Sequence, residues 1–310
     1  VPRGTGLRSL LGKGETTACE FRTAHAVTLW PIELDSVQYF SHAPDLSATQ
    51  LPQTRGARGG LRIRLRCGGG MAFNQLGMDR LAFYISAPDD VAFRLHELVL
   101  GAAAGTLVHD GRAASGGLAA LQWRGPDSVR PIGFGADEAL LPESLRAFSG
   151  YRLLQEAAAM PQRLLFFELT GLADRLARVT VSEVELMIFL DRGDPGLEAV
   201  VDARSFSLFC TPAINLFHKR LDRIQLGTGS WDDYHVVPDR TRPMDYEVHS
   251  IAAVTGYGTG RVAQQEFHPL YATYHDAAPP AEGDPLPPDD PGSCTSGKPG
   301  RIPACGRGGW

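Results

Sequence analysis

The segment from Leu61 to Cys67 alternates strictly between apolar residues and arginines. Successive side chains of a β-strand point to opposite faces of its sheet, so strict alternation predicts a strand that is buried on one face only. This half-buried strand is the clearest single element in the sequence. It requires a sheet that has one face in a hydrophobic core and the other face toward solvent.

Other short segments have the composition of helices or strands. Helices are predicted from Asp89 to Leu100 and from Glu143 to Ala159. Acidic residues at 89 and 90 suit the positive N-terminal end of a helix, and Pro161 ends the second one. Strands are predicted over residues 81–85, 106–109, 164–169, 184–190 and 206–210, with shorter β-type runs within 18–40, such as 26–30 before Pro31. A polar segment rich in proline and glycine, residues 41–60, is predicted to be a long loop.

These elements predict an α+β fold with β-rich mixed sheets and short helices. Both halves of the chain show the order strand, strand, short helix, strand, which suggests two similar α+β units. We therefore expect a first β-rich domain over residues 1–140 and a second α+β domain over residues 141–276. The tail, residues 277–310, contains 8 prolines and 7 glycines in 34 residues. We expect the tail to be disordered, because it cannot bury enough apolar surface to offset its ordering entropy.

Composition argues against several functional classes. A formal net charge of −5 gives no bulk attraction for DNA, RNA or anionic lipid. The longest nearly apolar run, residues 98–108, is well short of the about 18 residues that a membrane span needs. The chain begins at Val1 without a secretory signal, so we interpret it as a fragment or a processed chain. Five widely spaced cysteines form no Cys-x-x-Cys pair and are expected to be reduced and structural in a cytoplasm: Cys19, Cys67, Cys210, Cys294 and Cys305.

The sequence contains no motif that indicates catalysis, metal binding or cofactor binding. A phosphate loop needs four residues between its glycines and a Ser or Thr after its lysine, whereas residues 6–14 have five residues and a glycine at these places. No nucleophile elbow of the Gly-x-Ser-x-Gly type occurs. Three histidines and two carboxylates could converge in space without a metal-ligand spacing, namely His235, His249, His268, Asp239 and Glu247. Nothing in these residues supports covalent, acid-base or metal catalysis, and we predict that the protein binds no metal and no cofactor.

Several short strings resemble, in collinear order, blocks of the TssF family, also called VasA or ImpG, the baseplate subunit of bacterial type VI secretion. The string Cys210–Phe217, CTPAINLF, resembles a family signature. It is followed by Tyr234–Arg240, YHVVPDR, and by Tyr246–Ile251, YEVHSI. The upstream strings are Pro2–Thr5, Cys19–Thr23, Leu29–Ile32, Gly150–Glu156 and Arg163–Glu168. Together they extend from about residue 1 to residue 275.

The chain also departs from the family pattern. The family usually has aromatic residues after the position of Glu156, where this chain has Ala157, Ala158 and Met160. The family begins before Val1 and continues past residue 275, so the resemblance implies a middle portion of such a protein. The tail matches no family block, and it is interpreted as a frameshift product or as a disordered linker.

The resemblance implies that the protein is not an enzyme and has a structural role in a cytoplasmic baseplate at the inner face of the inner membrane. It implies assembly with TssG-like and TssE-like subunits, a second TssF copy and a TssK-like adaptor, without nucleic acid or direct membrane insertion. The family-motif residues that are candidates for an interface are Arg22, Thr23, Cys210, Thr211, Pro212, Asn215, Leu216, Phe217, Tyr234, Pro238, Asp239, Glu247 and Val248.

The role of the signature string has two interpretations. Pro212 ends a strand because it lacks an N–H donor, and Asn215 can bond to local backbone in a turn. Leu216 and Phe217 can then pack inside this chain or against a partner. At the level of function, two alternatives remain open from the sequence: a dispersed-site α+β enzyme acting on carbohydrate or nucleotide, and a stand-alone binding module.

Overall fold

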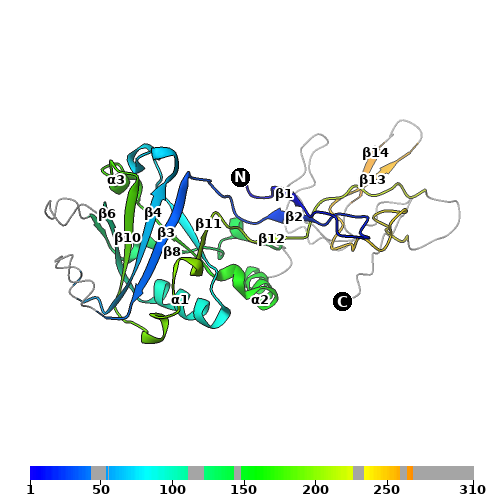
Figure 1. Ribbon diagram of the computed structural model, residues 1–310. Helices are drawn as coiled ribbons and strands as arrows, with labels where there is room; N and C mark the ends of the chain where they lie inside the picture. Colours follow the sequence, from blue (N-terminus) through cyan, green and yellow to red (C-terminus); the bar gives the residue numbers. More distant parts are fainter. Residues whose placement is uncertain are drawn as a thin grey trace, which may run out of the picture. The chain divides into compact units, whose positions relative to one another are not determined.

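A computed structural model describes residues 1–42, 54, 56–110, 122–142, 148–225, 234–258 and 264–267 (Figure 1). The chain divides into two compact units. Unit 1 consists of Val1–Thr5, Thr23–Leu141 and Gly150–Ile214, and unit 2 consists of Gly6–Arg22, Pro142–Ser149 and Asn215–Trp310. Neither unit is continuous in sequence, so the chain passes between them several times.

Unit 1 contains a five-stranded sheet in which every pair of neighbours is antiparallel. Its order is β3 (Ile32–Phe40), β4 (Gly59–Cys67), β10 (Glu183–Leu190), β6 (Ala103–His109) and β7 (Gln122–Arg124). A second, four-stranded antiparallel sheet has the order β11 (Phe206–Leu208), β5 (Leu81–Ile85), β9 (Phe166–Leu169) and β8 (Val129–Pro131).

Both sheets share one hydrophobic core with helix α1 (Asp89–Gly101). Ile63 and Leu65 of β4, Phe83 of β5, Phe167 of β9 and Leu95 of α1 are all fully buried in it. The rings of Phe83 and Phe167 stack across neighbouring strands, with their centroids 5.2 Å apart. The core therefore joins residues that are about a hundred positions apart in the sequence.

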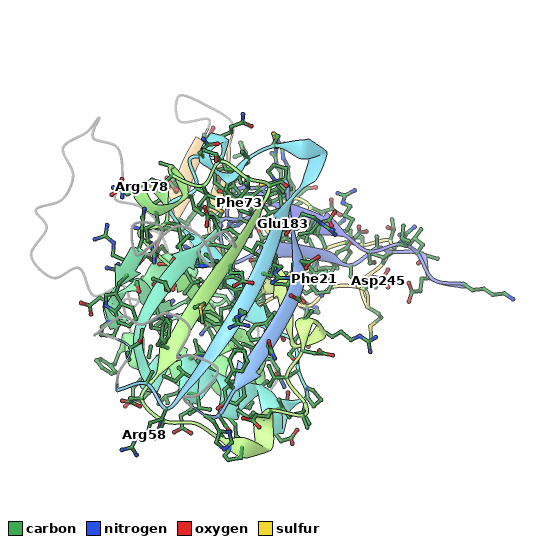
Figure 2. The ribbon with its side chains drawn as sticks, turned by 60° about the vertical axis from the view of Figure 1, so that its left-hand side comes forward. Phe21, Arg58, Phe73, Arg178, Glu183 and Asp245 are labelled. Carbon is green, nitrogen blue, oxygen red and sulfur yellow. The ribbon has the colours of Figure 1, made fainter. Side chains whose placement is uncertain are left out.

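The other face of β4 carries the arginines of the alternating segment, and Figure 2 shows this sheet with its side chains. Arg64 lies opposite Glu185 of β10 in the strand register, and its Nη2 lies 2.5 Å from the carboxylate. Arg66 reaches Glu33 of β3 at 3.4 Å. The predicted half-buried strand is thus confirmed, with apolar residues inward and ion-paired arginines outward.

One position of β6 accepts only glycine. Trp123 of β7 packs on Phe189 of β10, with ring centroids 5.4 Å apart, above Gly105. A Cβ atom on Gly105 would lie 2.2 Å from the Trp123 ring and 2.4 Å from the carbonyl oxygen of Arg124. The strand register shifts at the same place, between Phe189 and Leu190. Gly105 therefore allows an aromatic ring to cover the sheet where the ladder is irregular.

Short elements complete the described chain. Unit 2 contains the antiparallel pair β1 (Gly6–Arg8) and β2 (Glu20–Thr23) and the antiparallel pair β13 (Val254–Tyr257) and β14 (Gln264–Phe267). The last residue of β2, Thr23, belongs to unit 1. The remaining elements are η3 (Gly68–Gly70), η4 (Phe73–Gln75), η6 (Pro126–Ser128), η7 (Ala136–Glu138), α2 (Ser149–Ala159), η8 (Pro161–Leu164), α3 (Ala173–Leu176), η9 (Pro195–Leu197), η10 (Ala203–Ser205) and β12 (Ala213–Ile214).

The predicted α+β class, rich in sheet and with short helices, is confirmed. Several element boundaries differ. Residues 26–30 form no strand, and the strand begins after Pro31, where the missing N–H donor costs no ladder bond. Residues 161–164 form a short 3-10 helix, so β9 starts only at Phe166. The strand predicted over 206–210 ends at Leu208, because Phe209 has a φ of 60°, which a strand cannot accommodate.

The division of the chain differs from the predicted boundary near residue 140. Strand β10, from the second predicted domain, lies between β4 and β6 of the first, and hydrogen bonds to both. Similar local patterns in the two halves do not reveal which strands pair, because pairing is decided by non-local contacts. The two halves form common sheets rather than two similar units. The predicted disordered tail, residues 277–310, lies outside the described residues.

Candidate functional site

Segments that are far apart in the sequence meet in unit 1, at a place that we call the junction, formed by residues 1–5, 23–27 and 211–212. Thr23 is buried and lies at its centre. Its carbonyl accepts the N–H of Gly4 at 2.8 Å, its own N–H donates to the carbonyl of Thr5 at 3.2 Å, and its Oγ1 accepts the N–H of Thr5 at 3.1 Å. The side chain and backbone of one residue thus hold the first segment of the chain.

The signature string closes the junction from the other side. The carbonyl of Pro212 accepts the N–H of Ala24 at 2.9 Å, and Oγ1 of Thr211 accepts the N–H of His25 at 3.0 Å. The chain reaches this position through Phe209, whose left-handed backbone turns it at the end of β11. Such a conformation is uncommon for a bulky residue and persists only where surrounding contacts fix it.

These segments coincide with the places where the chain passes between the two units. The unit boundaries fall at Thr5/Gly6, Arg22/Thr23 and Ile214/Asn215, directly beside the hydrogen bonds of the junction. A further boundary falls at Leu141/Pro142. Unit 1 therefore holds the chain by hydrogen bonds to its backbone beside the boundaries at residues 5, 22 and 214. The motif strings Cys19–Thr23 and Cys210–Phe217 each contain one of these boundaries, and Pro2–Thr5 ends at another.

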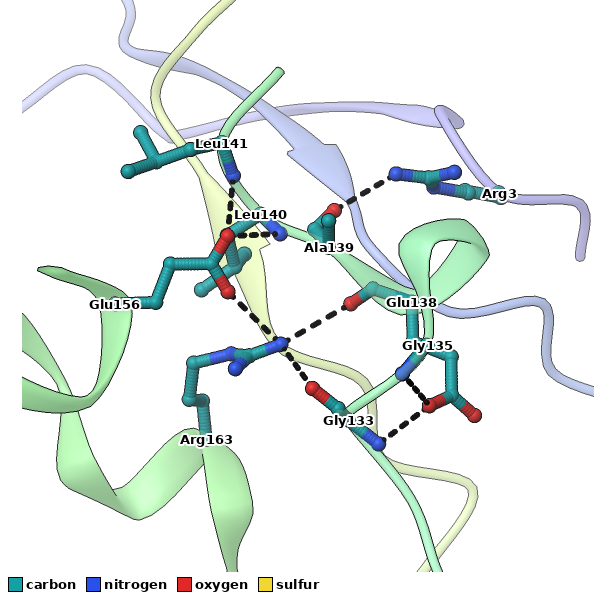
Figure 3. Close-up of polar contacts among 9 residues, drawn as sticks. All are labelled: Arg3, Gly133, Gly135, Glu138, Ala139, Leu140, Leu141, Glu156 and Arg163. Atoms are coloured by element: carbon teal, nitrogen blue, oxygen red, sulfur yellow. Dashed lines mark hydrogen bonds and ion pairs between the residues drawn. The ribbon is translucent and has the colours of Figure 1, made fainter. Parts of the chain in front are cut away.

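The anchor next to Leu141 is a buried carboxylate. Oε1 of Glu156, on α2, accepts the N–H groups of Leu140 at 3.2 Å and Leu141 at 2.9 Å (Figure 3). Oε2 of Glu156 lies 2.9 Å from Nη2 of Arg163, and the two side chains are only 2% and 1% exposed. The motif strings Gly150–Glu156 and Arg163–Glu168 therefore supply the two halves of one buried ion pair.

The segment around η7 surrounds this ion pair. Nη2 of Arg163 donates to the carbonyl of Gly133 at 2.6 Å and to that of Glu138 at 3.3 Å (Figure 3). The Glu138 carboxylate in turn accepts the N–H groups of Gly133 at 2.7 Å and Gly135 at 3.1 Å. Arg3 donates to the carbonyl of Ala139 at 2.8 Å. A continuous polar frame thus connects the N-terminal segment to α2.

His25 lies within the same region of unit 1. Its side chain is buried and its ring meets the Phe166 ring edge-on at 5.4 Å, and among the described residues its Nε2 has no hydrogen-bond partner. Burial lowers the pKa of His25 below its usual 6.5, Glu138 opposes this effect, and the charges of Arg163 and Arg3 add to it. Imidazole is therefore favoured over imidazolium in the folded protein.

We expect unit 1 to lose stability as the pH falls. With the pKa of His25 lowered by folding, the unfolded chain binds its proton first below about pH 6.5, so the free energy of unfolding decreases from about pH 7 to pH 5. Urea denaturation at several pH values measures this slope. His25→Gln should reduce the slope, whereas His249→Gln, at an exposed position, should leave it unchanged. An identical slope in all three proteins would contradict the prediction.

A loss of the Thr211 hydroxyl should loosen the junction. Thr211→Val keeps the shape of the side chain but leaves the N–H of His25 without its acceptor, which should cost about 1–2 kcal/mol. Hydrogen exchange at the His25 amide should become faster by at least about tenfold. Thr180→Val, at an exposed position, is the matched control and should change neither quantity. Unchanged protection of the His25 amide in Thr211→Val would contradict the prediction.

A second group of motif residues meets in unit 2. The rings of Phe217 and Tyr246 make an edge contact at 6.3 Å, and Nζ of Lys219 lies 4.4 Å from the centre of the Tyr246 ring. Lys219 also pairs with Asp239 at 3.5 Å. Hydrogen bonds from Thr241 and then from Lys219 hold the pKa of the Asp239 carboxyl below its usual value. Phe217, Asp239 and Tyr246 come from three different motif strings, and Lys219 lies two residues after the first of them. These strings therefore contact each other in unit 2, partly through Lys219.

The predicted interface residues are distributed over both units and differ in exposure. Thr23 and Pro212 are buried, and Cys210 and Thr211 are half-buried in unit 1. Asn215 and Glu247 are the exposed members. The remaining residues, all in unit 2, are half-buried: Arg22, Leu216, Phe217, Tyr234, Pro238, Asp239 and Val248.

Sequence reasoning did not assign roles to the charged residues of the frame. Arg3, Glu156 and Arg163 stand in motif strings, but Glu138 and His25 do not. Charged residues beside apolar runs, as in the string that begins at Arg163, are the signal that could have indicated a buried pair. Cys19, Cys67 and Cys210, the cysteines in the described part of the chain, are free.

The three histidines and two carboxylates that the sequence left as a conceivable group are not all within the described residues. His235, His249 and Glu247 are exposed in unit 2, Asp239 pairs with Lys219, and His268 lies outside the described residues. Over the described ranges, no group of three or more His, Cys, Asp and Glu side chains is arranged to hold a metal ion. Within the same ranges, no helix has both the length and the apolar character required to cross a membrane.

Comparison with known proteins gives the same family as the motif strings. Residues 1–283 match the family described as "Type VI secretion system, TssF". The chain is 44% identical over 272 residues to the type VI secretion system component TssF1 of Pseudomonas aeruginosa, covering 88% of this chain and 43% of that protein. The chain belongs to the TssF family of type VI secretion proteins.

A solved structure shows the same fold. The chain superposes with a TM-score of 0.64 and 25% identity on a chain of a type VI secretion system TssK-TssF-TssG baseplate subcomplex determined by cryo-electron microscopy. The match covers 87% of this chain and 47% of the other. The chain thus spans less than half the length of each of these relatives.

Proposed function

We propose that this chain is a structural part of a type VI secretion baseplate wedge and acts by holding other subunits in place. The observation that carries the proposal is the match over most of the chain to TssF1 and to a chain of the TssK-TssF-TssG subcomplex. We further propose TssG-like and TssK-like subunits as its partners. A TssE-like subunit, a second TssF copy and a cytoplasmic position at the inner membrane belong to the same proposal.

The polar groups of unit 1 support a structural role. In the junction and the polar frame, carboxylates and hydroxyls accept backbone N–H groups, and guanidiniums donate to backbone carbonyls. These contacts satisfy buried backbone groups, as a rigid scaffold requires. The proposal needs no metal or cofactor.

One exposed cluster invites the alternative of a hydrolytic enzyme. Ser41, His42 and Glu198 lie together in unit 1. In a hydrolytic triad the histidine stands between the serine and the acid and uses a different ring nitrogen for each. Here Nδ1 of His42 contacts both, at 2.9 Å from Oγ of Ser41 and 3.0 Å from Oε1 of Glu198, and Ser41 donates directly to Glu198. Hydrogen bonds from Ser41 and His42 lower the pKa of Glu198 to about 2, which leaves it a poor base. This arrangement favours a surface hydrogen-bond cluster.

Co-expression tests the proposal directly. The tagged chain should retain a TssG-like subunit through affinity purification and size exclusion, and TssK-like and TssE-like subunits are tested in separate arms. A chain that shows a cooperative unfolding transition but binds none of the subunits would contradict the scaffold proposal. Retention of the TssE-like subunit alone would contradict the proposed TssG contact.

The exposed motif residues are the proposed contact points. Asn215→Ala and Glu247→Ala should weaken retention of the TssG-like subunit without changing the stability of the chain, because both side chains are exposed. Glu97→Ala, also exposed and outside the motif strings, is the control. If a variant that carries both substitutions retained the TssG-like subunit in full, these two residues would not belong to the interface.

A further inference from the structure

The hairpin of β1 and β2 in unit 2 ends in a hydrogen-bonded turn. The N–H of Glu15 donates to the carbonyl of Gly12 at 3.1 Å, and the Glu15 carboxylate accepts the N–H of Gly12 at 2.8 Å. Gly14 has a φ of 91°, a left-handed conformation that glycine adopts without strain. Before the turn, the N–H of Ser9 donates to the carbonyl of Cys19 at 2.9 Å. The end of the hairpin is therefore held by its own contacts.

A second segment of unit 2 is bonded to this hairpin end. Nη1 of Arg242 donates to the carbonyl of Thr16 at 2.6 Å and to Oγ1 of Thr17 at 2.8 Å. The Thr17 hydroxyl donates to the Asp245 carboxylate. The N–H of Asp245 donates to the carbonyl of Arg242 at 3.3 Å, which closes a turn in the second segment. We call the two bonded segments the tip, which consists of residues 9–17 and 242–245.

The tip presents large apolar side chains almost entirely to solvent. Leu10 is 94% exposed, Met244 is 93% exposed and Leu11 is 56% exposed. Side chains exposed to this degree contribute almost nothing to the packing of their own unit, and exposed apolar residues that gather at one place mark an interaction site. Because nearly the whole surface of Leu10 and of Met244 faces water, a partner must be concave to cover them.

The charged groups of the tip differ in whether they are bound within it. The Glu15 carboxylate accepts the N–H of Gly12, and the Asp245 carboxylate accepts the hydroxyl of Thr17. Lys13 is exposed, and it forms no hydrogen bond or ion pair with any residue that the structure describes. Its ammonium group is available to a carboxylate of another molecule, and charges of opposite sign meet across protein interfaces. Charge complementarity therefore favours an acidic rim around the concave site.

The charge of the tip as a whole favours a protein over a lipid surface as its partner. Lys13 and Arg242 are balanced by Glu15 and Asp245, so the tip carries no net charge. Attraction to an anionic membrane grows with the number of basic residues near its surface, and a neutral tip gains none.

We propose that the tip docks into an apolar pocket, rimmed by carboxylates, on another protein subunit of the assembly. Leu10 and Met244 fill the pocket, and Lys13 pairs with its rim. This inference rests on the proposed function, because it requires that the chain holds other subunits. It adds contact residues to Asn215 and Glu247.

Titration of the tagged full chain with purified TssG-like, TssK-like and TssE-like subunits, each in a separate arm, tests the tip. Leu10→Ser combined with Met244→Ser should weaken the binding of one subunit by at least about tenfold. The urea unfolding curve should stay unchanged, because both side chains are exposed. Val200→Ser, at a position of unit 1 that is 50% exposed, is the control and should bind like the original chain.

The outcomes separate the tip from the proposed function. If the original chain binds a subunit and the double variant binds it equally well, the docking proposal fails and the proposed function stands. If the original chain binds none of the subunits, the proposed function fails, and the docking proposal fails with it.

The charge at position 13 gives a second measurement. Lys13→Glu should weaken the same binding by about three- to tenfold at low salt and by less at high salt, because salt screens the contact with an acidic rim. Lys13→Arg keeps the charge and should bind like the original chain. Equal affinities of these two variants at low salt would overturn the acidic rim and the proposal with it.

Two further measurements identify other occupants of the tip. Sedimentation velocity of the chain alone detects self-association, and flotation with vesicles of phosphatidylcholine and phosphatidylglycerol detects membrane binding. We expect neither to depend on the tip. Self-association or vesicle binding that the double variant abolishes would overturn the proposal, because the tip would then bind a second copy or a lipid surface.

Discussion

Glu156→Gln should destabilise unit 1 by about 3–5 kcal/mol, the cost of leaving one member of a buried ion pair without its counter-charge. Glutamine retains an oxygen that can accept the N–H groups of Leu140 and Leu141. The substitution therefore removes the charge next to Arg163 while it conserves size and the backbone contacts. Urea denaturation followed by tryptophan fluorescence measures the change in the free energy of unfolding.

The chain offers a matched control for this experiment. Glu97 forms an ion pair with Arg192 at 2.8 Å, similar to the 2.9 Å of the buried pair, but the two side chains are 70% and 53% exposed. Glu97→Gln should change stability by less than about 1 kcal/mol, because solvent screens an exposed pair. Equal losses in the two variants would show that burial does not determine the strength of the Glu156 pair.

Gly105→Ala should destabilise the five-stranded sheet by about 3 kcal/mol. The added Cβ would lie 2.2 Å from the Trp123 ring and 2.4 Å from the carbonyl of Arg124, so both the side chain and the backbone of β7 must move. Trp123 fluorescence should change along with the unfolding midpoint, because its ring loses its position on Phe189.

Gly125→Ala is the control, because Gly125 is a glycine of the same region where a side chain would meet no steric obstacle. Its φ is −67°, which alanine adopts readily, and a Cβ there would meet no atom of the described residues within 4 Å. We expect a change of less than about 1 kcal/mol, with a small gain from reduced freedom of the unfolded chain. A loss in Gly125→Ala as large as in Gly105→Ala would contradict the steric argument.

The local elements could be predicted from the sequence where a pattern has a single physical cause. The alternation of residues 61–67 indicates a strand and the two acidic residues in the first turn of α1 indicate a helix start, and both predictions are confirmed. The pairing of β10 with β4 and β6 depends on contacts between distant segments. No periodicity within a segment encodes such pairing, so the predicted boundary near residue 140 differs from the division found in the structure.

At the candidate site, the sequence likewise identified segments but not the contacts that their residues make. The motif strings identified the segments that meet at the junction, including Thr23 and Thr211. They did not identify the function of the individual groups, because the partners of Thr23, Thr211 and Glu156 are backbone N–H groups, which every residue except proline carries. The burial of Arg163 and its contact with Glu156 follow from how η8 meets α2, a property of the assembled fold.

The junction also has a consequence for synthesis on the ribosome. Residues 23–25 receive their final hydrogen-bond partners from Thr5 and from Thr211–Pro212, and the latter are translated almost two hundred residues later. At about 5–20 residues per second, the beginning of the chain waits on the order of ten seconds or more before its partners emerge. During this interval the first strands of unit 1 lack β10 and β11 and expose unpaired edges. We therefore expect these edges to stay open to pairing with other chains until residue 212 has left the exit tunnel.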